Sequence, residues 1–151
     1  MLKKTIKKVV AKKTAKKTVT VNKPVGKYDC QITKNDPVRE ERIDMTIVVD
    51  AYNSYERVIG WYCSLEGTIE NKVRCRCRKT RSMSPLTVGD DVEVLEMAPQ
   101  DDCEGEMFVF VRWNDRKLAV PLEQLEPISG DPKAIEMIED WLYWCLMGYE
   151  F

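Results

Sequence analysis

An acidic segment at residues 99–106 holds the densest group of side chains in this sequence that could do chemistry. Four carboxylates lie within six residues, and Gly105 permits a tight turn beside them: Asp101, Asp102, Glu104 and Glu106. We expect this segment to form a loop, where like charges so close together repel one another unless a cation lies between them. The segment therefore predicts either a site for a hard metal cation or a solvated hydrophilic loop.

A second group of acids lies near the end of the sequence, at Glu136, Glu139, Asp140 and Glu150. Glu136 and Asp140 are four residues apart, so in a helix they would share one face and repel each other, and a cation would relieve that repulsion. The alternative is a helix that exposes acids opposite an apolar stripe. The pattern favours this second interpretation.

Asp50 is a separate candidate, because apolar or aromatic residues flank it on both sides, at Val48, Val49, Ala51 and Tyr52. Its carboxylate could cap a helix that begins a few residues later. It could instead project into a polar site. The helix cap is the favoured interpretation.

The absence of histidine argues against catalysis. Without His the chain lacks the commonest general base and the usual partner of a Ser or Cys nucleophile. No Gly-rich phosphate-binding loop is present either. We therefore expect a protein that is not an enzyme.

Six cysteines bear on the cellular compartment and on zinc binding. No apolar secretory signal precedes them, so we expect reduced thiols in a cytoplasmic protein. Only Cys75 and Cys77 are close in sequence, and their spacing does not suit the paired ligands of a structural zinc site, so we expect them to face a core. No run approaches the ~20 apolar residues that cross a bilayer, and we expect no membrane association.

The charges divide the chain into two parts. Residues 1–27 contain ten Lys and no acid, so residues 28–151 keep 24 − 10 = 14 basic residues against 25 acids, a net charge of −11. We expect a disordered Lys-rich arm at 1–27 and a single acidic domain at 28–151. The arm is a candidate for binding nucleic-acid phosphates or a charge-balancing tail, and its paired lysines are Lys3, Lys4, Lys7, Lys8, Lys12, Lys13, Lys16 and Lys17.

Helical periodicity dominates the first half of the acidic domain. From Pro37 onward, Ile43, Ile47, Val48 and Ala51 form one apolar stripe, and Pro suits a first helical turn. A second helix should follow and end near Gly67, with one apolar side formed by Val58, Trp61, Tyr62 and Leu65. These patterns predict an αα-hairpin or a broken helix.

Strand signals follow between residues 68 and 128. Residues 73–78 alternate cysteine with arginine, and Asn114-Asp115 suits a hairpin turn between residues 107–113 and 117–120. A final helix should begin after Asp131, with Pro132 in its first turn, and stop at Gly148. The fold class we expect is α+β, with N-terminal helices, a small SH3-like β-barrel and a C-terminal helix.

Several strings in this order, across residues 37–151, resemble the cyanobacterial-type family of small acidic calcium-binding proteins. They are Arg39-Glu40-Glu41-Arg42-Ile43, Ile47-Val48-Val49-Asp50-Ala51-Tyr52, Gly60-Trp61-Tyr62, Ser84-Pro85-Leu86, Met97-Ala98-Pro99, Ala119-Val120-Pro121-Leu122 with Gln124-Leu125, and Asp140-Trp141-Leu142-Tyr143-Trp144 with Gly148-Tyr149-Glu150-Phe151.

The resemblance implies a cytoplasmic buffer or sensor that binds Ca²⁺ through surface carboxylates. It does not imply a helix-loop-helix calcium loop, whose Asp-x-Asp-x-Asp-Gly string is absent. The ligands we predict rest on carboxylate chemistry: Asp101, Asp102, Glu104, Glu106, Glu136, Glu139, Asp140 and Asp50. The alternative function is an SH3-like interaction module carried on a nucleic-acid-binding arm.

Overall fold

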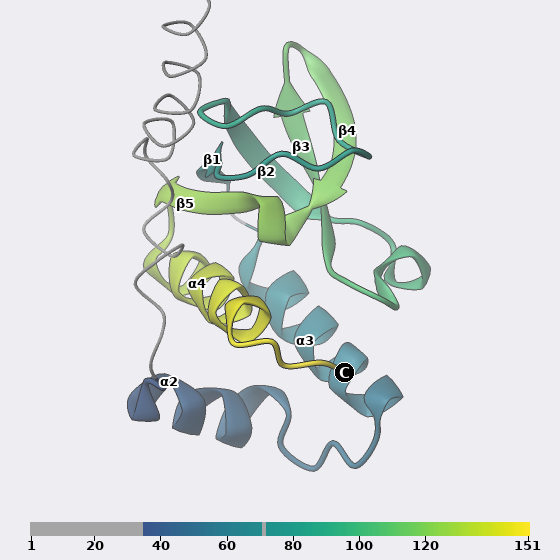
Figure 1. Cartoon of the computed structure of the whole chain (residues 1–151), viewed down its shortest axis with the longest axis vertical. Coiled ribbons are helices and arrows are strands. Elements are labelled where there is room, and N and C mark those ends of the chain that lie inside the picture. The colour runs from purple at the N-terminus through teal and green to yellow at the C-terminus, as the bar shows by residue number, and fades with distance from the viewer. Residues whose placement is uncertain (1–34, 71) are drawn as a thin grey trace, which may run out of the picture.

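The computed structural model describes residues 35–70 and 72–151. The expected Lys-rich arm at 1–27, with its candidate nucleic-acid ligands, lies outside these residues. The helices gather at one end of the molecule and the strands at the other, and α3 and α4 pack side by side between α2 and the sheet (Figure 1). The α+β class is therefore confirmed.

The first helix begins where the sequence predicts. α2 spans Pro37–Arg42, with Pro in its first turn, and the side chain of Asp36 caps it by accepting a hydrogen bond from the Arg39 N–H at 3.2 Å. A π-helical segment, Ile43–Ile47, continues it and buries Ile43 and Ile47. Sequence periodicity does not reveal the change of helix type.

The second helix, α3, spans Ser54–Thr68 and buries the four residues of the predicted stripe, Val58, Trp61, Tyr62 and Leu65. The prediction that Asp50 caps this helix is wrong. Asn53 is the cap, because its side chain accepts a hydrogen bond from the Glu56 N–H at 2.9 Å. Asp50 is exposed in the preceding turn, where its φ of 60° places it in the left-handed region.

Five antiparallel strands form one sheet in the order β4-β3-β2-β1-β5. Asn114 and Asp115 both have positive φ, 50° and 61°, as the predicted tight hairpin turn between β3 and β4 requires. The bounds are β1 Val73–Cys77, β2 Asp91–Met97, β3 Phe108–Trp113, β4 Arg116–Pro121 and β5 Leu125–Ser129.

The predicted closure into an SH3-like barrel is not confirmed. The strand order places the last strand beside the first, as such a barrel needs, but β4 and β5 lie at opposite edges of an open sheet. The structure establishes the strand order and the antiparallel pairing, and no ladder between β4 and β5 is present within the described residues.

The last helix, α4, spans Pro132–Leu146, and the Asp131 side chain caps its start as predicted by accepting hydrogen bonds from two backbone N–H groups. At its other end Gly148 has a φ of 78°, and the Tyr149 N–H donates to the Trp144 carbonyl at 3.1 Å. Among the helices in the described part of the chain, none has the length and apolar character needed to cross a bilayer.

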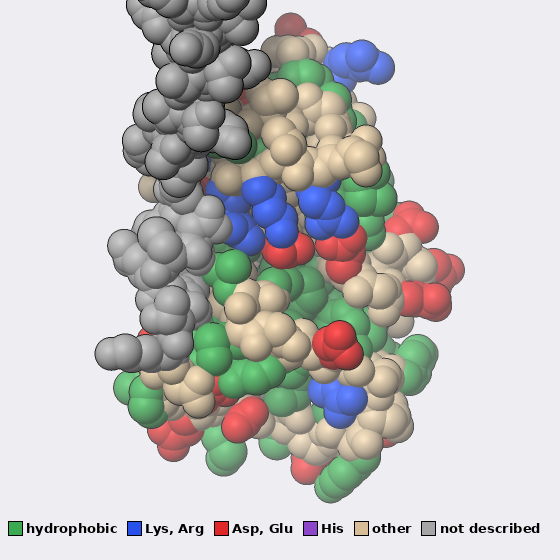
Figure 2. All heavy atoms as spheres, viewed as in Figure 1, with side chains coloured by type: hydrophobic (Ala, Val, Ile, Leu, Met, Phe, Trp, Pro, Cys, Tyr) green, Lys and Arg blue, Asp and Glu red, His purple; other side chains and the backbone are tan. Residues whose placement is uncertain are grey.

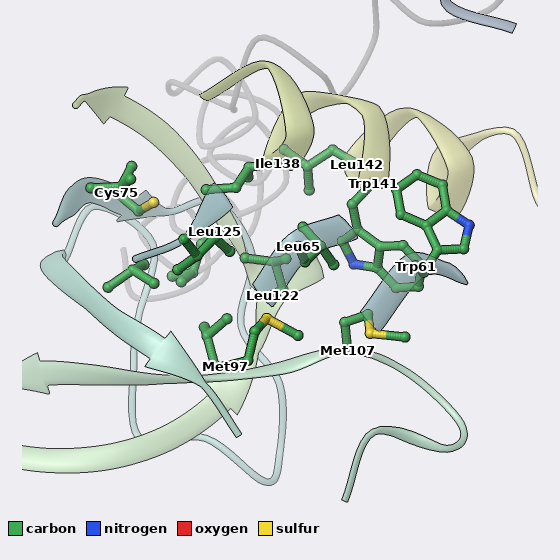
Figure 3. Packing of buried hydrophobic residues seen from close by; sticks show 14 of the residues in the cluster. Trp61, Leu65, Cys75, Met97, Met107, Leu122, Leu125, Ile138, Trp141 and Leu142 are labelled. Carbon is green, nitrogen blue, oxygen red and sulfur yellow. The ribbon is translucent and has the colours of Figure 1, made fainter. Parts of the chain in front are cut away.

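Packing between the helices and the sheet forms a single core (Figure 3). Cys75 and Cys77 face this core from β1, as the alternating pattern predicts. Trp61 of α3 meets Trp141 of α4 edge to face, with ring centroids 5.1 Å apart. The tryptophans therefore join the two helices.

Gly60 sets how closely α3 approaches the π-helical segment. A Cβ at this position would lie 2.2 Å from the Ile47 carbonyl oxygen, a backbone atom that cannot rotate away. We expect Gly60→Ala to lower the free energy of unfolding by ~1–3 kcal/mol through overpacking, measured by urea denaturation.

Gly67→Ala is the matched control, because Gly67 lies in the same helix and its added Cβ would meet nothing within 4 Å. This variant should be neutral or gain up to about 1 kcal/mol from helix propensity. Equal stability of the two variants would contradict the assigned contact.

Candidate metal site

The acidic segment forms the loop between β2 and β3, and its two ends are fixed to the core. At the neck, the Ala98 N–H donates to the Phe108 carbonyl at 3.0 Å, and the Tyr62 hydroxyl donates to the Ala98 carbonyl at 2.8 Å. Because Tyr62 belongs to α3, the loop is tied to the helical layer as well as to the sheet.

Cys103 anchors the middle of the loop. It ends a short 3₁₀ turn, Gln100–Cys103, and its buried sulfur accepts a hydrogen bond from the Phe108 N–H at 3.4 Å. Burial raises the pKa of the Cys103 thiol, so the group stays protonated at neutral pH. The thiol therefore anchors the loop and is a poor metal ligand.

Three of the loop carboxylates, Asp101, Asp102 and Glu104, are exposed. Within the described part of the chain they form no ion pair and their side chains accept no hydrogen bond. Asp101 and Glu104 border one pocket of about 340 Å³, and Asp102 borders another of about 310 Å³. They share a loop but do not converge, and the described residues contain no ready-made group of three metal-binding side chains.

Glu106, the fourth loop acid, pairs with Arg81, which lies in the segment between β1 and β2. It accepts hydrogen bonds from Arg81 at 2.9 and 3.2 Å, and Arg81 also lies 3.5 Å from Glu123. Hydrogen bonding to Glu106 raises the pKa of the Arg81 guanidinium. Figure 2 shows, on the face that it draws, a row of basic side chains directly beside acidic ones.

A further pocket, of about 430 Å³, adjoins this network. Glu106, Glu123 and Glu150 line it together with aromatic residues of α4 and the segment that follows. Lys79 and Arg81 pair with Glu123, and Arg81 also pairs with Glu106, so two of the three acids in this pocket are neutralised.

Asp140 differs most from its predicted environment. Its side chain is 0% exposed and accepts hydrogen bonds from Arg42 Nε at 2.8 Å, Arg42 Nη2 at 2.6 Å and Arg39 Nη1 at 2.8 Å. The interpretation of an exposed acid is therefore wrong here. The cation beside Glu136 and Asp140 comes from the chain itself, because Arg42 also lies 3.5 Å from Glu136.

The sequence pattern does not predict this ion cluster of Asp140 with Arg39 and Arg42. The signal for it was present, since Arg39 and Arg42 are three residues apart and so share a helix face. Nothing in the local pattern, however, links them to an acid about one hundred positions later. Of the remaining candidates, Glu139 is half-buried on α4 and Asp50 is exposed in its turn.

Glu40 adds a second connection between α2 and the C-terminal region. It accepts hydrogen bonds from the hydroxyls of Tyr143 at 2.7 Å and Tyr149 at 2.6 Å. The bond to Glu40 raises the pKa of Tyr149 to about 12. Both hydroxyls donate to Oε1 of Glu40, so this one carboxylate oxygen links α2 to α4 and to the segment that follows it.

The donor chemistry of the loop fits calcium. Ca²⁺ prefers several hard oxygen ligands from carboxylates, carbonyls and water. Asp101, Asp102 and Glu104 supply carboxylates that no described cation neutralises, and the loop backbone adds carbonyl oxygens. Ion binding would require these exposed side chains to converge.

Comparison with known proteins gives a consistent result. The family model CcbP, described as calcium binding, matches residues 41–145. The crystal structure of CcbP from Anabaena shares 38% identity, with a TM-score of 0.69, and the match covers 78% of this chain and 97% of that one.

A second solved structure, described as a calcium-binding protein in the calcium-binding form, shares 37% identity with a TM-score of 0.68. That match covers 78% of this chain and 96% of that chain. No curated protein matched.

Removal of the Asp140 charge should destabilise the protein. In Asp140→Asn the two guanidinium groups lose their shared carboxylate in a site where Arg39 and Arg42 are only 20% and 28% exposed. We expect a loss of about 2–4 kcal/mol in the free energy of unfolding, measured by urea denaturation.

Glu136→Gln is the control, since Glu136 is 54% exposed and contacts Arg42 at the longer distance of 3.5 Å. This change should cost less than about 1 kcal/mol. Similar losses of unfolding free energy in both variants would show that the buried cluster contributes no more to stability than the exposed contact does.

Proposed function

Because this chain belongs to the CcbP family of calcium-binding proteins, we propose that it binds calcium through the loop between β2 and β3. In this proposal it acts as a cytoplasmic buffer or sensor of the ion. The observation that carries the assignment is that some acids are paired with arginine and others are not. Asp101, Asp102 and Glu104 have no cationic partner among the described residues, whereas Glu106 and Asp140 are bound by arginines.

Unpaired carboxylates on one short loop favour a divalent cation for an electrostatic reason. Each of the three repels the others, and a bound Ca²⁺ replaces that repulsion by attraction. An acid that already accepts bonds from arginine would have to give them up first. Asp140 and Glu106 would therefore contribute to calcium binding only at the expense of stability.

The cysteines support a reducing compartment such as the cytoplasm. The five cysteines in the described part of the chain are all free thiols, and none forms a disulfide there. Burial raises the pKa of Cys75 to about 12, so this thiol remains protonated and packs as a small apolar group.

The fixed neck of the loop supports ion binding without a large rearrangement of the globule. Both ends of the loop are held by backbone hydrogen bonds, and the buried Cys103 holds its centre. An ion at Asp101, Asp102 and Glu104 would reorganise exposed side chains first. We therefore favour a buffer-like response of the globule itself, and we propose no catalytic role.

Neutralising the loop should weaken calcium binding. We expect Asp101→Asn with Asp102→Asn to raise the calcium dissociation constant by about tenfold or more, since two hard anionic ligands are lost. Calorimetric titration of the full chain in moderate salt with magnesium present measures the effect and excludes loose counterion binding.

Two further double variants test the location of the site. Asp115→Asn with Glu70→Gln removes the same charge from exposed positions outside the loop and should change the constant less than about twofold. Glu136→Gln with Glu139→Gln tests the predicted ligands on α4. If this last pair lowers affinity and the loop pair does not, the assignment of the loop is wrong.

The fixed neck also predicts a small spectroscopic response. Near-ultraviolet circular dichroism reports the packing of Trp61 against Trp141 and Trp144, whose ring centroids lie 5.1 and 5.5 Å from that of Trp61. We expect saturating calcium to leave this spectrum nearly unchanged, because the ligands lie outside the core. A large change would instead identify the globule as a shape-changing sensor.

A further inference from the structure

We propose that the pocket beside the acidic loop holds lysine side chains from residues 1–27 of this same chain, and that calcium displaces them. The calcium-dependent part rests on the function proposed above, whereas the docking of lysine does not. The pocket has a volume of about 340 Å³ and lies between the loop, the start of α3 and Phe151.

The lining of this pocket suits a long cationic side chain. Tyr55, Val58 and Phe151 form its apolar wall, while Asp101 and Glu104 supply carboxylates. A lysine can bury its aliphatic stem against such a wall and place its ammonium group between carboxylates and aromatic rings. Tyr55 is 65% exposed, so its ring is accessible to an incoming side chain.

The charge of the pocket distinguishes it from its neighbour. In the larger pocket, cations of the globule already neutralise two of the three acids, Glu106 and Glu123. In the pocket at Asp101 and Glu104, the described residues provide no such partner. A cation from elsewhere is therefore favoured here and not in the neighbouring pocket.

Residues 1–27 supply that cation within the same molecule. They contain ten Lys and no acid, against a net charge of −11 for residues 28–151. Lys27 lies eight positions before Asn35, the first described residue, and such a length spans up to about 26–29 Å. A globule of this size has a radius of gyration of roughly 13 Å, which corresponds to a diameter of about 34 Å. Lys17 lies 18 positions before Asn35, a length that spans up to about 59–65 Å, so Lys17 and the lysines before it can reach any point on the surface of the globule.

Covalent linkage also makes docking intramolecular, with an effective concentration on the order of millimolar. Because lysine and calcium would use the same carboxylates, each must weaken the other by an equal factor. Docked lysines would thus raise the calcium concentration at which the loop fills. Bound calcium would in turn release residues 1–27, and the chain would gain a switch that its fixed globule lacks.

Carbodiimide cross-linking of the full chain tests the docking directly, because this reagent joins lysine amines to carboxylates that touch them. Without calcium, we expect links from residues 1–27 to concentrate on Asp101 and Glu104. Glu41 and Asp115 are exposed acids that serve as internal controls. Links distributed according to exposure over all acids would overturn the proposal.

Mixing isotopically light and heavy chains identifies the source of the lysine. Links within one isotope support docking in the same molecule. Mixed links would show that a second copy is the occupant, which overturns the assignment to the chain's own lysines. Saturating calcium should suppress the links to Asp101 and Glu104 and spare those to Asp115.

A calcium titration of four full-length proteins supplies the second test. Replacing all ten lysines of residues 1–27 by glutamine should tighten calcium binding about three- to tenfold. Tyr55→Ala keeps both carboxylates and should tighten binding in the native chain but add nothing to the glutamine chain. If the effects of Tyr55→Ala and of the lysine replacements on calcium affinity were additive, the proposed competition at this pocket would be overturned.

The two proposals fail in different ways. If calcium binds but Asp101→Asn with Asp102→Asn leaves affinity unchanged, the calcium assignment fails while the cross-links to Asp101 and Glu104 still stand. If that variant weakens calcium binding and the cross-links spread over all acids, the calcium site stands and the docking proposal fails.

Discussion

The carboxylate of Asp140 lies at the junction of α2 and α4 and has no contact with water. Arg39 and Arg42 reach it from α2, so a charge buried on α4 fixes the position of a helix about one hundred residues earlier. Glu40, on the same turn, holds Tyr143 and Tyr149. The placement of the C-terminal segment, and with it Phe151 beside the acidic loop, depends on this cluster.

Acid content is a poor guide to metal sites in this protein, because the acids perform two tasks. Some are structural and accept bonds from arginine or tyrosine, as Asp140, Glu106 and Glu40 do. Others, such as Asp101, have no cationic partner among the described residues. The second group carries the functional proposal, since electrostatic repulsion within it favours any cation that can enter.

Local patterns predicted much of the fold. The apolar stripe of α3, the alternation in β1 and the turn at Asn114-Asp115 depend on neighbours in sequence, and the structure contains them. Long-range features were not predictable in the same way. The partners of Asp140 and the open sheet depend on contacts between distant segments, which periodicity does not encode. The four acids of the loop were found by their density, but their different directions were not.

An open sheet has a cost that a closed barrel avoids, because two strands leave backbone groups without a neighbouring strand. The residues of these strands oppose edge-to-edge pairing with strands of separate molecules. Pro127 removes an N–H from the middle of β5, and Arg116 and Lys117 place positive charge along β4. We therefore expect these edge residues to disfavour the addition of a strand from another molecule to either edge of the sheet.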